Sequence, residues 1–105
     1  MTDKNTHQHA HVRLSKDTVD LIRTYVKKVD PNAEAYIFGS RANLTKKGGD
    51  IDILIISLIF DFLHAQHLRI NIQKLIGEQK IDVIYAKDKT TDPFVSIILE
   101  KAFKL

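Results

Sequence analysis

The sequence predicts a small α/β (α+β) domain, a sandwich of helices on a sheet of at least three strands. Segments with apolar residues at helical spacing alternate with short runs of branched apolar residues, which is typical of strands joined by helices. The run over residues 50–56 is apolar at almost every position and indicates a strand covered on both faces. A chain of 105 residues suits one domain.

The first helix is expected over residues 16–29. Ser15 is a suitable N-cap, and Asp17 places a negative charge in the first turn, where it meets the helix dipole. Pro31 ends the helix, because proline disfavours helical geometry in the residue before it.

Strands are expected over residues 35–38, 50–56 and 81–86, where apolar and branched residues cluster between loops. A turn at Gly39-Ser40 ends the first of these strands. Residues 41–44 after the turn are expected to form one helical turn.

Two further helices are expected. The first covers residues 62–76, whose apolar residues follow helical spacing, and Gly77 ends it. The second covers residues 93–103, with Asp92 as the N-cap and Pro93 at the first helical position.

Composition excludes several classes of protein. The chain has 44% hydrophobic and 28% charged residues, a net charge of +3 and no cysteine, which excludes a disulfide framework and thiolate metal sites and favours the cytoplasm. No segment resembles a signal peptide or a membrane span, so no membrane is expected as a partner. The small basic excess fits either an ordinary soluble protein or a phosphate-bearing partner. There is no basic block of the kind that binds nucleic acid directly.

The domain itself is expected to span residues 12–105. Residues 1–11 are polar and are expected to form a flexible N-terminal tail. His7, His9 and His11 alternate in this tail, and such spacing could place three metal ligands on one face of a strand. A frayed, soluble tail is the simpler interpretation.

Two carboxylates stand at the head of the second expected strand. Asp50 and Asp52 are two residues apart and therefore share one face, although aspartate is disfavoured inside strands. Their mutual repulsion disappears if they bind Mg²⁺, which prefers carboxylates, waters and phosphates. Asp82 heads the third strand and joins them if the two strands are neighbours in register. Three carboxylates suffice for two metal ions.

Gly39 and Ser40 could form the phosphate-binding half of the same site. Glycine lets the backbone approach a phosphate closely, and a helical turn opened by Ser40 would direct its hydroxyl and N–H groups toward an anion. Arg41 could add a charge, as could Lys46 and Lys47 from the following loop. Taken singly, Gly-Ser is usually a turn and Asp-x-Asp a solvated pair; their combination in this order is what favours a site.

This combination resembles the DNA polymerase β-type nucleotidyltransferase superfamily. The pattern is Gly39-Ser40, then nine residues, then Asp50-x-Asp52 at a strand start and a third aspartate on the next strand. The length of the chain and its closing DPFVSIILEKAFKL are similar to those of the minimal nucleotidyltransferase (MNT) domains within it, including the antitoxins of HEPN/MNT toxin–antitoxin pairs. The similarity runs from the first helix to the end of the chain.

The resemblance implies a polymerase β-like fold, a small mixed sheet flanked by helices. It also implies that Asp50 and Asp52 bind two Mg²⁺ ions, with Asp82 completing the second site and acting as general base or positioning the acceptor. Gly39 and Ser40 would hold the β- and γ-phosphates of ATP. An AMP group would pass to a hydroxyl, and the expected acceptor is a tyrosine of a partner HEPN toxin.

Two positions depart from the family pattern. Asn43 stands where arginine is frequent, and Gly49 stands where serine often precedes the first aspartate. Neither change removes a carboxylate, so a competent enzyme is expected. The alternatives are a binding antitoxin that neutralises its partner stoichiometrically, and an adenylyltransferase of small molecules.

The acceptor surface is expected to come from another chain, since no second domain follows the last helix. Leu54 and Ile56 share the strand face of the aspartates. That apolar face is expected to be covered by the partner or by a second copy of this chain.

Overall fold

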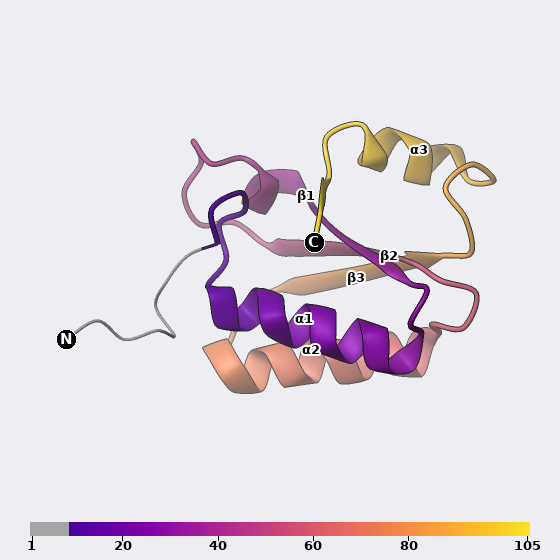
Figure 1. Ribbon diagram of the computed structural model, residues 1–105. Helices are drawn as coiled ribbons and strands as arrows, with labels where there is room; N and C mark the ends of the chain where they lie inside the picture. The colour runs from indigo at the N-terminus through magenta and orange to yellow at the C-terminus, as the bar shows by residue number, and fades with distance from the viewer. Residues whose placement is uncertain (1–8) are drawn as a thin grey trace.

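The computed structural model describes residues 9–105 as a four-stranded sheet with helices on both faces (Figure 1). The strand order is β3-β2-β1-β4, so β2 lies inside the sheet and is paired along both of its edges. In chain order the elements are α1 (Lys16–Val29), β1 (Glu34–Phe38), the 3₁₀ turn η2 (Gly39–Ala42), β2 (Ile51–Ile56), α2 (Phe62–Ile76), β3 (Ile81–Ala86), α3 (Pro93–Leu99) and β4 (Phe103–Lys104).

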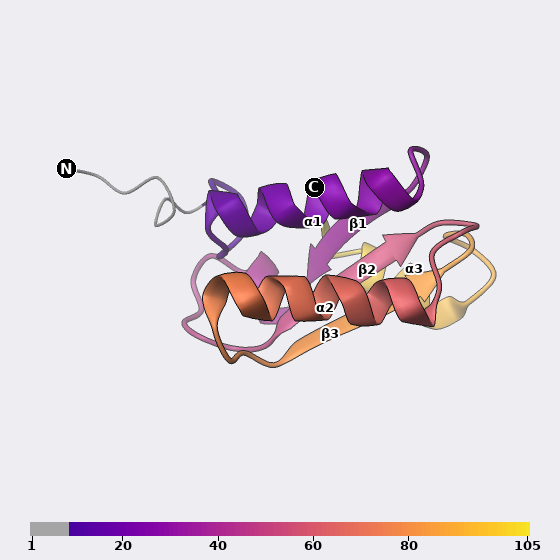
Figure 2. The same cartoon turned by 90° about the horizontal axis from the view of Figure 1, so that it is seen from below.

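The sheet is mixed, as the resemblance implied. Strand β1 runs antiparallel to β2 and to β4, whereas β2 and β3 are parallel and are joined through α2. Helices α1 and α2 lie side by side across one face, and α3 lies on the other face (Figures 1 and 2). The predicted α/β sandwich is therefore confirmed.

Three of the residues that set helix boundaries, Ser15, Gly77 and Asp92, are those predicted from the sequence. The side chain of Ser15 accepts a hydrogen bond from the Thr18 N–H, and that of Asp92 accepts one from Phe94. Gly77 ends α2 with a positive φ of 87°. Helices α1 and α2 and strand β3 have the predicted bounds. Strand β1 begins one residue earlier than predicted, and β2 begins one residue later. The helical turn covers residues 39–42 instead of 41–44.

The near-continuous apolar character of β2 reflects burial on both faces, as expected. Ile51, Ile53 and Ile55 are fully buried beneath α1 and α2. On the opposite face, Leu54 and Ile56 pack with Val95 and Ile98 of α3. The expectation that a partner or second copy covers this face was therefore wrong, because the chain's own α3 covers it.

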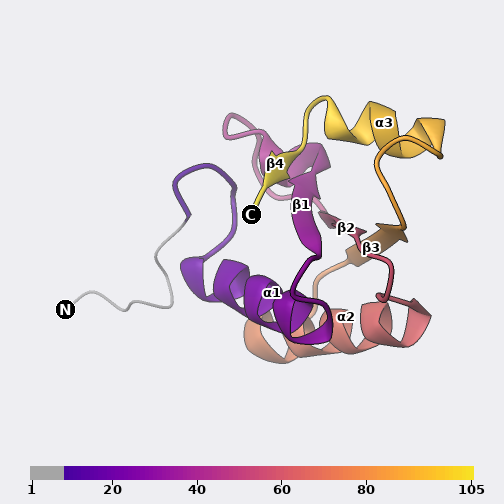
Figure 3. The ribbon, with the colours of Figure 1, turned by 45° about the vertical axis from the view of Figure 1, so that its right-hand side comes forward.

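The C-terminal segment differs from the prediction. The helix expected over residues 93–103 ends at Leu99, and Phe103 and Lys104 form β4 along the free edge of β1 (Figure 3). Ile37 pairs with Phe103, and the Leu105 N–H donates to the Ala35 carbonyl at 2.8 Å. Pairing with β1 satisfies edge groups of that strand that a longer helix would leave open.

The last residues of the expected tail lie against the domain. The ring of His11 stacks on that of Phe103 at 5.0 Å, and the His9 N–H donates to the Leu14 carbonyl at 2.8 Å. His7 and residues 1–8 in general lie outside the described residues, so the interpretation of residues 1–11 stays a prediction. Within the described range, none of the helices is both long and apolar enough to cross a membrane.

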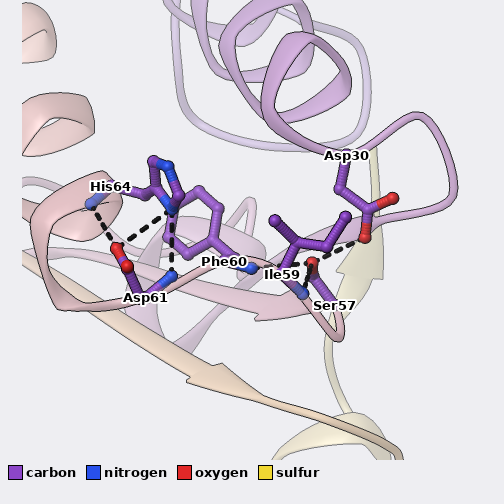
Figure 4. A network of polar contacts seen from close by, with 6 residues as sticks. All are labelled: Asp30, Ser57, Ile59, Phe60, Asp61 and His64. Carbon is purple, nitrogen blue, oxygen red and sulfur yellow. Dashed lines mark hydrogen bonds and ion pairs between the residues drawn. The ribbon is translucent and has the colours of Figure 1, made fainter.

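A buried polar network fixes the connection from β2 to α2 (Figure 4). The Ser57 hydroxyl donates to the carboxylate of Asp30 at 2.6 Å and accepts from the Phe60 N–H at 3.0 Å. This hydroxyl is the main reason that the pKa of Asp30 is lowered. Asp61 and His64 then form a reciprocal capping box that starts α2. The network thereby sets where the parallel crossover begins.

The carboxylate of Glu34, the first residue of β1, forms ion pairs with two lysines from the C-terminal part of the chain. It accepts from the Tyr36 hydroxyl at 2.7 Å and pairs with Lys89 at 2.8 Å and Lys104 at 3.1 Å. These contacts, with Lys89 first, lower the pKa of Glu34 from 4.5 to about 2. The stability that they contribute is therefore present above pH 4.5 and is lost as the pH falls through the lowered pKa of Glu34.

We expect the variant Glu34→Gln to unfold at a lower denaturant concentration than the wild type at neutral pH. The difference should narrow as the pH falls from 4.5 to about 2, because the wild-type carboxylate then becomes protonated. Urea denaturation followed by circular dichroism across this range measures it. Glu78→Gln, at an exposed position, is the control. If the difference in stability between Glu34→Gln and the wild type did not change with pH, the attribution to the ionised carboxylate of Glu34 would be wrong.

Candidate active site

The candidate site lies where β2 begins, between the end of β1 and the start of β3. In the sheet register Asp52 stands opposite Phe38, the last residue of β1, and opposite Asp82 on the parallel strand β3. Side chains of directly paired residues point to the same face. Asp52 of β2 and Asp82 of β3 thus lie side by side on one face of the sheet. This is the register on which the predicted position of Asp82 depended.

The turn after β1 lies directly against this row. Gly39 has a φ of 68°, and a Cβ atom built on it would collide with the carboxylate of Asp52. Only glycine lets the backbone turn here and approach the carboxylate this closely. Gly39, Asp52 and Asp82 therefore form a contiguous row from the turn after β1 across β2 to β3. Their roles in binding phosphate and metal stay predictions.

Asp50 lies just before β2, half-buried, and is turned toward a lysine. Its carboxylate is 3.6 Å from the Nζ atom of Lys80. Among residues 9–105, no three histidine, aspartate or glutamate side chains converge closely enough to hold a metal ion. The donor set, carboxylate oxygens alone, suits a hard cation such as Mg²⁺. The contact with Lys80 uses one carboxylate oxygen of Asp50, Oδ2.

The electrostatics at Asp52 also fit a cation-binding group. Burial raises the pKa of Asp52, and the neighbouring charges of Asp82 and Asp50 raise it further. Lys80 opposes this effect only weakly. Ionisation of Asp52 is thus less favourable in the metal-free fold than in water, and a bound cation would relieve the repulsion.

Two arginines hold the loop that connects η2 to β2. The guanidinium of Arg13 donates to the carbonyls of Ser40 and Gly48, both at 2.8 Å, and to that of Asn43 at 2.9 Å. Arg41 donates to the carbonyls of Arg13 at 2.8 Å and Gly49 at 3.2 Å. These bonds fix both ends of the loop, so the turn and the carboxylates keep their spacing.

Arg41 was predicted to contact phosphate, and this role stays a prediction. In the structure its side chain lies with Arg13 and Gln79 in a hollow beneath the loop, on the side of α1. The Gln79 side-chain amide donates to the Gly49 carbonyl at 3.1 Å. Sequence reasoning missed Arg13 and Gln79, because each is far along the chain from the loop and neither belongs to a motif.

Comparison with known protein families now identifies the chain. The family described as nucleotidyltransferase domain matches residues 19–105, which include the whole row of candidate site residues. The chain belongs to the nucleotidyltransferase domain family. Comparison with curated proteins gave no match. Membership supports nucleotidyl transfer as the general activity of the domain.

The structure gives a local reason for one departure of this nucleotidyltransferase domain from the family pattern. Gly49 has a φ of 91°, and a Cβ atom there would collide with the hydroxyl of Ser40. The glycine therefore permits both the backbone conformation of the loop and its close contact with the turn. The serine that is frequent at this position does not fit the loop as it is built here.

We expect Gly49→Ser to lower the free energy of unfolding by about 1–3 kcal/mol, although it restores the more frequent residue. The strain comes from the positive φ and from the contact with Ser40. Gly48→Ser is the matched control, because Gly48 also has a positive φ, of 60°, but its Cβ would meet no atom within 4 Å, so that variant carries backbone strain without the steric contact. Chemical denaturation measures both. Equal losses for the two variants would contradict the steric argument.

Asp52→Asn is expected to raise the melting temperature of the metal-free protein at pH 7. It removes a carboxylate whose ionised form is disfavoured by burial and by Asp82 and Asp50. The gain should shrink toward about pH 4, because the wild-type carboxylate then takes up its proton in the folded state. Thermal unfolding in EDTA measures the effect, with exposed Asp20→Asn as the control. A lower melting temperature for Asp52→Asn at pH 7 would contradict it.

Proposed function

We propose that this domain is a Mg²⁺-dependent nucleotidyltransferase that moves AMP from ATP to a hydroxyl of a partner HEPN toxin, and thereby acts as the antitoxin of the pair in the cytoplasm. The observation that carries the proposal is the row in which Asp52 lies between the glycine turn at Gly39 and the carboxylate of Asp82. This row combines a place for phosphates with carboxylates on one edge of the sheet.

Asp50, Asp52 and Asp82 would hold two Mg²⁺ ions. When bound, the ions supply positive charge that stabilises the transferring phosphoryl group and the leaving pyrophosphate. Asp52 is held in place by β1 and β3 on either side, whereas Asp50 lies on the loop before β2 and pairs with Lys80. Gly39 and Ser40 would keep the phosphates in line with these carboxylates.

Asp82 is the residue best placed to receive a proton. It is exposed, and β3 is an outer strand of the sheet. An acceptor hydroxyl would give its proton to Asp82 as its oxygen forms a bond with the α-phosphorus of ATP. The bond between the α-phosphorus and the bridging oxygen to the β-phosphate breaks, and pyrophosphate leaves with that electron pair.

The exposure of Asp82 also supports an acceptor on another chain. A side chain at the open edge of the sheet is accessible to a tyrosine that a partner presents. The HEPN toxin as partner follows from the resemblance of the chain to MNT domains. In this proposal the partner supplies the acceptor surface.

One observation favours a second candidate function, stoichiometric neutralisation of the partner without catalysis. Asp50 pairs with Lys80, and the three carboxylates do not converge within the described part of the chain. In that case the carboxylates are structural, and variants that lack them should still bind and suppress the partner.

Transfer of label separates the two functions. With α-labelled ATP, Mg²⁺ and the HEPN protein, we expect the label to appear on the HEPN protein with a small molar fraction of the domain present. Asp50→Ala and Asp82→Asn should each reduce the rate at least 100-fold. Exposed Asp20→Asn should leave it unchanged. No transfer, together with suppression of the toxin by Asp50→Ala at a one-to-one ratio, would establish stoichiometric binding instead.

A further inference from the structure

A pocket of about 480 Å³ opens beside the glycine turn, and it is separate from the hollow that Arg13 and Arg41 line. Its volume is within the usual range for sites that bind small molecules. The lining combines the turn, the start of the loop and one residue from the C-terminal segment. The residues that line it are Gly39, Ser40, Ala42, Asn43, Leu44, Lys46 and Lys101.

The charged side chains that line this pocket all have one sign. Lys46 and Lys101 are both exposed, and no aspartate or glutamate lines the pocket. Within residues 9–105 neither lysine has a salt bridge, whereas Lys80 pairs with Asp50, and Lys89 and Lys104 pair with Glu34. Although the carboxylate of Asp52 lies against Gly39, it does not line this pocket, and the two ammonium groups that do line it favour an anionic ligand.

The two arginines nearest the turn do not supply this charge. Both guanidinium groups are engaged with carbonyls of the loop and lie in the hollow on the α1 side. Asn43, which lines the pocket, is neutral, and its side-chain oxygen accepts from Thr45. The positive charge that reaches the pocket therefore comes from Lys46 and Lys101.

Strand β4 explains how a distant lysine reaches the turn. Because β4 runs antiparallel to β1 and pairs Phe103 with Ile37, the residues just before Phe103 lie beside the end of β1. The chain between α3 and β4 passes close to η2, as Figure 3 shows. Lys101 is thus brought to Gly39 although the two are far apart in sequence.

We infer that Lys101, together with Lys46, binds the β- and γ-phosphates of the nucleoside triphosphate in this pocket. The inference rests on the proposed function and adds to it the residues that recognise the polyphosphate. A lysine ammonium contacts phosphate as a point charge, so its contribution depends on charge more than on exact shape. The ligand class is a compound with at least two linked phosphates, because a monophosphate lacks the β- and γ-phosphates that the two lysines would bind.

Binding measurements test this inference without relying on turnover. Isothermal titration calorimetry with Mg²⁺ would compare ATP, inorganic tripolyphosphate and AMP. We expect Lys101→Gln to weaken the binding of ATP and tripolyphosphate about 10-fold, and AMP by less than 2-fold, because only the polyphosphate contact is lost. Lys101→Arg should restore most of the affinity. Lys87→Gln removes the same charge from an exposed position that does not line this pocket, and should bind like the wild type.

The outcomes distinguish this inference from the proposed function. The inference would be overturned if Lys101→Gln bound tripolyphosphate with unchanged affinity, or if its affinities for AMP and ATP fell by the same factor. This holds even if the wild type transfers label. Weaker tripolyphosphate binding with no label transfer by the wild type would support the pocket and remove the transferase proposal. Thermal unfolding of each variant verifies that the exposed substitutions leave the fold intact.

Discussion

The arrangement of β2 is the constraint on which the rest of the structure depends. This strand pairs with β1 on one edge and β3 on the other, and helices cover both of its faces. A strand so enclosed is held in register, because a shift of one residue would turn the side chains that now pack under α1 and α2 toward α3, and those under α3 toward α1 and α2. The position of Asp52 at its head is therefore fixed from both sides. The glycine turn and Asp82 owe their places to the same two pairings.

Much of this arrangement could be predicted because its signals are local. The caps Ser15 and Asp92 and the stop at Gly77 mark helix ends through contacts within a few residues. The spacing of Gly39 and Asp52 lies within one hairpin, so the sequence alone could bring them together. Predicting the position of Asp82 required one further assumption, that β2 and β3 are paired in register. The pairing in the structure agrees with that assumption.

The rest depends on contacts between distant residues. Strand β4 contains only Phe103 and Lys104, and its formation follows from the free edge of β1 rather than from its own sequence. Extending the last helix to Phe103 was reasonable by local propensity and was overridden by this pairing. For the same reason no local signal placed Lys101 beside the turn, or Arg13 beneath the loop.

The strand order also implies a sequence of assembly for the candidate site. The turn and its neighbouring aspartates belong to one antiparallel pair, which closes a short stretch of chain. Asp82 arrives only after the crossover through α2 has formed, and Lys101 only when the end of the chain returns to β1. Because long loops are slow to close, the β1–β2 hairpin with Gly39 and Asp52 would form first, and the pocket would be completed later. Synthesis from the N-terminus imposes the same order, so the last residues of the chain complete the pocket.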